Sequence, residues 1–307
     1  CEAEGLERLA SALDEAGVTG IGVPNVYRVD ETELEITAIR SSGASDRARA
    51  VLGEGLARMH GLRQNAYGWG RDNYIGLSPQ PNRWSDNWGE FFVQDRLGYQ
   101  VSRIRDTGQR NRFQRVLDEH GGTLIDWLNA HCEHPSLLHG DLWNGNVLYG
   151  TDGPWLIDPA VYCGDREADI AMTQMFGGFG EAFYRAYDEH YPRTPAYGVK
   201  REVYNLYHYL NHYNLFGGGY LGGCQSGIAA IEAIDQAGTA KHKDPQCDSD
   251  ARQQGRQRND IGGQPVIAAQ RFHHHKTGGC RRAGKEQEHQ AQFGTTETCQ
   301  PGRARAK

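Results

Sequence analysis

Apolar residues stop abruptly near residue 223, and this limits how much of the 307-residue chain can fold. The last leucine is Leu221, and residues 224–307 contain no Leu, Trp, Tyr or Met and only two Phe. A segment of this composition cannot bury enough apolar surface to offset the entropy lost on ordering. We therefore expect residues 224–307 to be disordered or an out-of-frame extension, except for a short helix that could run over residues 228–234.

Charge is divided unevenly between these two parts. The whole chain carries 33 Lys and Arg against 39 Asp and Glu, a net charge of -6. Residues 224–307 hold 13 basic and 9 acidic residues, which leaves residues 1–223 with a net charge of -10. Nucleic-acid binding usually requires a basic surface, so we expect no nucleic-acid partner. An anionic substrate would have to be held by a local site or a metal ion.

Cysteine use and hydropathy indicate the compartment. Seven cysteines form an odd set without any C-x-x-C spacing, which argues against a disulfide framework and against a zinc knuckle. No run approaches the roughly 20 apolar residues that a membrane span needs, and no signal peptide is recognisable. We expect a protein of the reducing cytoplasm that does not enter membranes.

Hydrophobic spacing predicts the order of the elements in the folded part. A helix over residues 2–16 is followed by two strands within residues 23–40 and by a helix over residues 46–60. Residues 67–82 (YGWGRDNYIGLSPQPN) are rich in Gly, Pro and Asn and predict a loop. Helices then dominate, with separate segments expected over residues 88–105, 113–120 and 124–130.

Residues 137–162 (LLHGDLWNGNVLYGTDGPWLIDPAVY) contain the polar residues that best suit a reaction. Two short apolar strands flank a Thr-Asp-Gly turn, which predicts a hairpin after the loop that begins at His139. This arrangement fixes Asp141 and Asn146 on the loop and Asp158 at the exit of the second strand. We therefore expect the three side chains to surround one site.

Asp141, Asn146 and Asp158 form a set that suits phosphoryl transfer from ATP. In that reaction the protein mainly positions the reactants and holds magnesium on the phosphates. Asp141 would orient the acceptor hydroxyl and take its proton, and Asn146 and Asp158 would supply the oxygen ligands that Mg²⁺ prefers. The alternative is that Asp141 only caps a turn and that Asp158 only ends a strand.

The spacing of these residues resembles that of a known superfamily. H-G-D-x-x-x-x-N from His139 to Asn146, followed after 12 residues by Asp158, is similar to the catalytic and metal-binding loops of protein-kinase-like enzymes, including aminoglycoside kinases. Further segments resemble the fructosamine kinase family, the ketosamine-3-kinases: HGDLWNGN, IDPAVY, GDREADIAM, FGGF and NLFGGGYLG. The matches extend over about residues 2–222.

This resemblance implies a fold and an activity. The fold would be α+β and protein-kinase-like with two lobes, a truncated N-terminal lobe over residues 1–44 and a mainly helical catalytic lobe over residues 45–223. The activity would be ATP-dependent phosphorylation of the sugar 3-hydroxyl of a ketosamine, the adduct that forms when a sugar glycates an amine. Because the product sheds its sugar, the enzyme would repair glycation of small amines or proteins.

The resemblance also implies residue roles. By position, Asp141 would be the catalytic base, Asn146 and Asp158 the metal ligands, and Trp143 a wall of the sugar site. The alternative for Trp143 is ordinary packing. His139 belongs to the same loop motif and would support it.

Two acidic residues outside the loop would support the site. Asp169 is expected to brace the catalytic loop, with a solvated charge at a helix start as the alternative. Glu2 lies where the family has a glutamate that pairs with a phosphate-binding lysine. The family places that lysine and a glycine-rich turn before this helix, so we expect the truncated chain to lack them. A related kinase of aminoglycosides or amino alcohols and an inactive kinase-like domain stay open as alternatives.

Two other motifs favour packing over chemistry. The G-x-G-x-x-G pattern within residues 217–222 follows a predicted helix rather than a strand, which favours a helix stop over a dinucleotide site. His208 and His212 share a helix face but lack the glutamate of the metalloprotease pattern, which favours packing over zinc binding.

Overall fold

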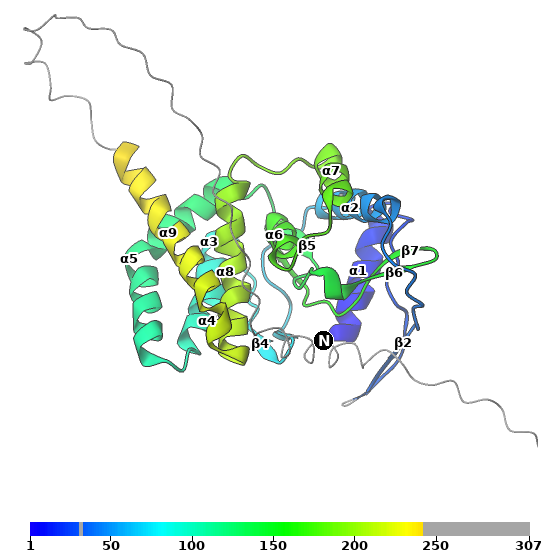
Figure 1. Ribbon diagram of the computed structural model, residues 1–307, viewed down its shortest axis with the longest axis horizontal. Coiled ribbons are helices and arrows are strands. Elements are labelled where there is room, and N and C mark those ends of the chain that lie inside the picture. Colours follow the sequence, from blue (N-terminus) through cyan, green and yellow to red (C-terminus); the bar gives the residue numbers. More distant parts are fainter. Residues whose placement is uncertain (31–32, 242–307) are drawn as a thin grey trace, which may run out of the picture. The chain divides into compact units, whose positions relative to one another are not determined.

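Helices and short antiparallel ribbons form the structure, a computed structural model that describes residues 1–30 and 33–241 (Figure 1). The helices are α1 (Glu2–Glu15), α2 (Asp46–His60), α3 (Trp88–Phe91), α4 (Tyr99–Ser102), α5 (Thr107–His131), α6 (Glu167–Met175), α7 (Glu181–His190), α8 (Tyr197–Phe216) and α9 (Leu221–Lys241). A π-helix, η1 (Phe92–Gly98), joins α3 to α4, and short 3-10 helices form η2 (Asn144–Asn146) and η3 (Gly218–Tyr220). All described residues belong to one compact unit.

The strands pair in twos. They are β1 (Val26–Val29), β2 (Leu34–Ile36), β3 (Asn73–Ile75), β4 (Ser78–Gln80), β5 (Ser136–Leu138), β6 (Val147–Gly150), β7 (Gly153–Leu156) and β8 (Tyr162–Gly164). Neighbours in sequence pair as β1–β2, β3–β4 and β6–β7, whereas β5 pairs with the distant β8. The β6–β7 pair is the hairpin that the sequence predicted.

The β5–β8 ribbon lies between two hydrophobic clusters. Its strands are antiparallel, and Leu137 lies opposite Cys163 in the cluster formed with α1, α2 and α7. The next pair, Leu138 and Tyr162, belongs to the cluster formed with α3, α5, α8 and α9. Successive side chains of a strand point to opposite faces, which explains this division. Loops that leave the ribbon therefore start between two packed cores.

Helix α2 shows how local sequence and packing combine. The Ser45 side chain accepts a hydrogen bond from the Ala48 main chain and so caps the helix start. Leu52 is fully buried and faces inward. Gly53 lets α2 approach α7 closely, because a Cβ at this position would lie 2.2 Å from the carbonyl oxygen of Phe183. The apolar face and one glycine thus fix α2 against α7.

Helix α5 corrects the expectation of two separate segments. It runs without interruption through Gly121 and Gly122, although each glycine weakens a helix by about 1 kcal/mol relative to alanine. Leu117 and Leu124, on either side of the glycines, are buried in the core. Tertiary packing therefore overrides the local preference for a break.

The loop expected over residues 67–82 contains the β3–β4 hairpin instead, with Asn73 opposite Gln80. Both side chains are buried. The Asn73 amide donates to the Val161 carbonyl oxygen at 2.8 Å, and the Gln80 amide donates to that of Ala160 at 3.1 Å. Buried amides here replace the apolar alternation that usually indicates a strand, so the loop prediction was wrong.

Helix α9 contains the short helix expected over residues 228–234 and corrects the expectation that the residues around it have no regular structure. It extends to Lys241, and Ile228 and Ile231 are buried in the cluster that α5 and α8 form. Isoleucines three residues apart lie on one helix face, and this short stripe provides the contact that average composition does not reveal. Residues 242–307 of the expected tail lie outside the described residues. The division of the body at residue 44 stays a prediction.

Candidate active site

The segments next to β5 and β8 meet beside the ribbon. The main-chain N–H of Ala160 donates to the carbonyl oxygen of His139 at 2.8 Å, which continues the pairing beyond the strands. Gly140 follows with a φ of +82°, and a Cβ there would lie 2.0 Å from the Ala160 carbonyl oxygen. Only glycine fits this conformation and this close contact. The direction in which the chain reaches Asp141 therefore depends on Gly140.

Hairpin β6–β7 brings the remaining predicted residues to the same place. The main-chain N–H of Ile157 donates to the Asn146 carbonyl oxygen at 3.1 Å, so the next residue, Asp158, lies beside Asn146. The Asn146 side-chain amide donates to Asp141 Oδ2 at 3.1 Å and lies 3.4 Å from the Asp158 carbonyl oxygen. The structure thus gathers the three residues that the sequence singled out.

Three carboxyl groups near this point have raised pKa values. Burial and, after it, the negative charge of Asp158 raise the pKa of Asp141 to about 7. The same two causes raise the pKa of Glu2, at the start of α1, to about 7. Asp158 itself reaches solvent, yet partial burial of its carboxyl group raises its pKa. Carboxylates arranged in this way favour a bound cation, which would relieve their repulsion.

The available oxygen atoms suit a magnesium ion that also binds phosphates. In residues 1–30 and 33–241, no group of three or more His, Cys, Asp or Glu side chains is placed to hold a metal by itself. Mg²⁺ typically takes one or two carboxylates from the protein and completes its octahedron with water and phosphate oxygens. Asp158 can provide the carboxylate. The Asn146 amide nitrogen faces Asp141, which leaves the amide oxygen as a second ligand.

Asp158 has a strained backbone. Its φ is +51°, and no other non-glycine residue in the described ranges has a positive value. For most L-amino acids this left-handed conformation costs roughly 1–2 kcal/mol, and Asp adopts it more readily than most because its short side chain can hydrogen-bond locally. Strain of this kind concentrates at functional sites, where the position of the side chain matters more than stability. The backbone thus gives a reason, independent of the motif, to assign a function to Asp158.

His139 connects the two loops as a neutral imidazole. Its Nε2 lies 3.0 Å from the Ile157 carbonyl oxygen and therefore carries the ring proton, whereas Nδ1 accepts from the Asp141 N–H at 3.3 Å. Burial lowers the pKa of His139, which favours the same neutral state. The predicted supporting residue thus contacts both the loop and the residue before Asp158.

Asp169 contacts the catalytic loop from α6. Its Oδ2 accepts from the His139 N–H at 2.7 Å and its Oδ1 accepts from the Gly140 N–H at 2.9 Å. Burial alone would raise the pKa of Asp169, but these bonds and the nearby His60 hold it below its usual value. The side chain is almost fully buried, so it is not the solvated charge of the alternative interpretation.

Trp143 lies at the surface of the same loop. Its indole covers Gly145, where a Cβ would fall 2.2 Å from the ring. The Trp143 ring contacts Phe176 edge to face, with centroids 5.7 Å apart, and Phe176 is 37% exposed. The two rings therefore form a partly open aromatic surface rather than part of a closed core.

Sequence analysis did not single out His60, which contacts Asp169, or Tyr187, which contacts His60. His60 Nε2 lies 3.3 Å from Asp169 Oδ2, and His60 Nδ1 lies 2.9 Å from the Tyr187 hydroxyl. The available signal was the position of His60 one turn after Leu56 on the apolar face of α2. A histidine on such a face usually indicates packing, so the pattern alone did not reveal this contact.

Sequence comparisons find a matching family model and several similar proteins. A family model described as fructosamine kinase matches residues 1–233. A Vibrio parahaemolyticus protein provisionally named a ketoamine kinase is 44% identical over 181 residues, which cover 59% of this chain and 62% of that protein. A chloroplastic protein-ribulosamine 3-kinase of Arabidopsis thaliana is 42% identical over 212 residues, which cover 65% of this chain and 63% of that protein. The chain therefore spans less than two thirds of the length of these relatives.

Solved structures show the same fold. A protein from Haemophilus somnus 129PT, provisionally named a fructosamine-3-kinase, aligns with a TM-score of 0.64 and 29% identity over 76% of this chain and 78% of its own. A second, from Thermobifida fusca YX-ER1 and named in the same way, aligns with a TM-score of 0.64 and 30% identity over 76% of this chain and 79% of its own. The expected α+β, protein-kinase-like fold is confirmed.

Proposed function

The chain belongs to the fructosamine kinase family, and from this premise we propose that it transfers the γ-phosphoryl group of ATP to the 3-hydroxyl of a ketosamine sugar. Relatives named ketoamine kinase and ribulosamine 3-kinase support this substrate class. The observation that carries the proposal is the contact of Asn146 with both Asp141 and Asp158. Phosphoryl transfer depends on such positioning because the protein contributes little covalent chemistry of its own.

Asp141 takes the proton of the acceptor hydroxyl. The Asn146 amide holds Oδ2, so the other carboxylate oxygen, Oδ1, receives that proton. A pKa raised to about 7 makes Asp141 a stronger base than an ordinary aspartate. The main-chain bond from Asp141 to His139 keeps the residue in place.

Asn146 and Asp158 would hold a magnesium ion that also binds the nucleotide phosphates. When bound, the ion neutralises the charge that develops on the transferred group. After burial, the negative charge of Asp158 helps to raise the pKa of Asp141, and a divalent ion bound beside them would relieve this repulsion. Glu2, at the start of α1, is a further carboxyl group whose pKa is raised by burial and then by the charge of Asp158.

Trp143 forms one wall of the sugar site. The C–H face of a sugar is apolar and packs well against an aromatic ring, while its hydroxyl groups bond to polar residues nearby. The partly open surface that Trp143 forms with Phe176 supports this role. His139 and Asp169 act behind the loop and support its conformation.

The product of this reaction sheds its sugar, so the activity repairs glycated small molecules or proteins.

No helix in the described part of the chain is long and apolar enough to cross a bilayer. Cys132 and Cys163 carry free thiols, which supports a reducing compartment such as the cytoplasm.

The test is ATP consumption by the purified protein with a synthetic fructosamine or ribulosamine as the acceptor. An aminoglycoside and an amino alcohol serve as parallel acceptors, and the Asp141→Asn variant serves as the blank. We expect turnover with the ketosamine and none above the blank with the other acceptors. Turnover confined to the aminoglycoside or the amino alcohol would replace the proposed substrate, and no turnover with any acceptor would indicate an inactive domain.

A further inference from the structure

A chain of hydrogen bonds runs from the catalytic loop to buried charges behind it. It begins at Asp169 Oδ2, which lies 3.3 Å from His60 Nε2, and continues from His60 Nδ1 to the Tyr187 hydroxyl at 2.9 Å. A guanidinium nitrogen of Arg166 donates to the same hydroxyl at 3.3 Å. His60 is 0% exposed and Tyr187 is 1% exposed. Bulk water therefore does not compete for these bonds.

The partners determine where the protons lie in this chain. A carboxylate only accepts hydrogen bonds, so His60 Nε2 carries the proton that is shared with Asp169. His60 Nδ1 is then the acceptor, and the Tyr187 O–H donates to it. The Tyr187 oxygen in turn accepts from Arg166. Each link has one donor and one acceptor, and the chain joins a buried anion to a buried cation.

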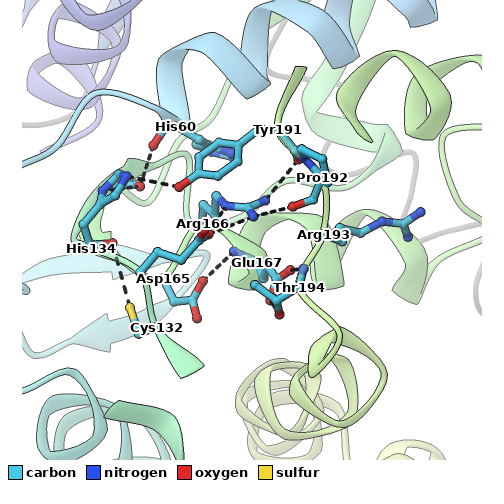
Figure 2. Close-up of polar contacts among 12 residues, drawn as sticks. His60, Cys132, His134, Asp165, Arg166, Glu167, Tyr191, Pro192, Arg193 and Thr194 are labelled. Atoms are coloured by element: carbon cyan, nitrogen blue, oxygen red, sulfur yellow. Dashed lines mark hydrogen bonds and ion pairs between the residues drawn. The ribbon is translucent and has the colours of Figure 1, made fainter. Parts of the chain in front are cut away.

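Arg166 is held on several sides, which fixes the far end of the chain. Figure 2 shows its guanidinium beside the main-chain carbonyl groups of Tyr191 and Pro192, to which it donates at 3.4 Å and 2.7 Å. The same group forms an ion pair with Glu133 at 2.9 Å and lies 3.5 Å from the centre of the Tyr191 ring. Movement of Arg166 would break several contacts at once.

We propose that His60 is a positioning residue for phosphoryl transfer, which keeps both oxygens of Asp169 bonded to the N–H groups of His139 and Gly140. Among the described residues, His60 is the basic side chain within ion-pair distance of Asp169. Without it, the Asp169 carboxylate is free to turn, and the loop that carries Asp141 loses a fixed acceptor. The effect on turnover rests on the proposed function, whereas the effect on the loop does not.

Two substitutions at His60 separate hydrogen bonding from packing. His60→Leu fills the space without polar atoms, and His60→Gln keeps an N–H donor for Asp169. We expect kcat of His60→Leu to fall roughly 10- to 100-fold, because small misplacements of reacting groups have effects of this size. The KM values for ATP and for the ketosamine should change by less than about threefold, since ground-state binding is retained. His60→Gln should recover most of the lost kcat.

Amide hydrogen exchange measures the loop without turnover. The His139 and Gly140 amides should exchange roughly tenfold faster in His60→Leu, because their acceptor is no longer fixed. Tyr187→Phe keeps the ring but removes the hydroxyl, and we expect a smaller change in the same direction. His190→Leu is the matched control, because His190 also joins α7 to α2, through Glu54 at 3.5 Å. It should behave like the wild type.

These outcomes decide the proposal. Wild-type kcat and exchange in a folded His60→Leu protein overturn it, and so does an equal loss in His60→Leu and His60→Gln, which indicates packing. If His60→Leu does not fold, unchanged exchange in Tyr187→Phe overturns it and faster exchange supports it. A wild-type protein without ketosamine turnover contradicts the proposed function instead, and the exchange measurement still tests the role of His60.

Discussion

The buried carboxylates at the start of α6 have a lysine as their partner, whereas the carboxylates of the candidate site have no lysine or arginine partner among the described residues. Lys200 lies 2.7 Å from Asp165 and 2.9 Å from Glu167, and all three side chains are almost fully buried. Asp141 and Asp158 lie near each other, and no Lys or Arg of the described residues forms an ion pair with either. The first group is complete within the protein, whereas the second gains from a cation.

This difference separates scaffold from ligand site. A buried network in which every charge has a partner holds one geometry and loses much stability when a partner is removed. Carboxylates that repel each other reduce stability, and proteins keep such groups where a ligand or a reaction requires them. Substitutions in the α6 group should therefore affect folding, and substitutions in the candidate site should affect chemistry.

Asp141→Asn should have the largest effect on chemistry and should not lower the stability of the fold. Loss of a general base lowers kcat by roughly 10²- to 10⁴-fold, while the affinity for nucleotide should stay close to the wild-type value. Steady-state kinetics and titration calorimetry with Mg-ATP measure the two quantities. Near-normal turnover in the variant would exclude Asp141 as the base and remove the distinction between the two groups.

Lys200→Met should have the largest effect on folding. It leaves Asp165 and Glu167 buried without their cation, and breaking a buried pair in this way costs about 3–5 kcal/mol. Urea unfolding measures the loss. The matched control is Arg201→Met, which removes the partly exposed pair with Glu202 and should cost at most about 1 kcal/mol. Equal losses in the two variants would contradict the role of the α6 group.

Asp158→Ala should weaken magnesium-dependent nucleotide binding. We expect the affinity for Mg-ATP to fall by at least roughly tenfold. Removing a residue that only supports a metal ligand already lowers metal affinity by about 10- to 100-fold, and removing a ligand itself should cost no less. The affinity for ATP measured in a chelator should not change, because the nucleotide contacts themselves remain. An unchanged Mg-ATP affinity would count against Asp158 as a ligand and leave its strained backbone without a functional reason.

The proximity of Asp141, Asn146 and Asp158 was easier to predict from the sequence than the scaffold behind them. Asp141, Asn146 and Asp158 are fixed by one loop and one hairpin, which are local features with clear turn and strand signals. His60 and Tyr187 are separated by 127 positions in the chain. No local pattern reports a contact over that distance, and a buried histidine resembles an ordinary core residue.

The prediction of helices and strands was limited in the same way, by contacts between distant residues. Helix α2 and hairpin β6–β7 follow apolar periodicity and were predicted with their correct positions. Asn73 and Gln80 form a hairpin through buried amides, a signal that resembles a polar loop. Helices α5 and α9 depend on contacts with distant residues, so glycine content and average composition gave the wrong ends. Prediction failed where tertiary packing decided between local alternatives.

Asp141 lies on the catalytic loop, and Asp169 contacts the same loop from α6. The contribution of each carboxyl group to the free energy of unfolding should nevertheless change with pH in opposite directions. The pKa of Asp141 is raised to about 7, so the folded state binds this proton more tightly and the contribution is lost as pH rises from about 4 to about 7. The pKa of Asp169 is lowered, so its contribution is present above about pH 4 and is lost on further acidification. Urea unfolding across this range should show that the free energy of unfolding of Asp141→Asn increases relative to that of the wild type as pH rises. Asp169→Asn should be less stable than the wild type above about pH 4, and this difference should disappear only as pH falls below about 4. The same pH trend in both variants would contradict the contrast between site and scaffold.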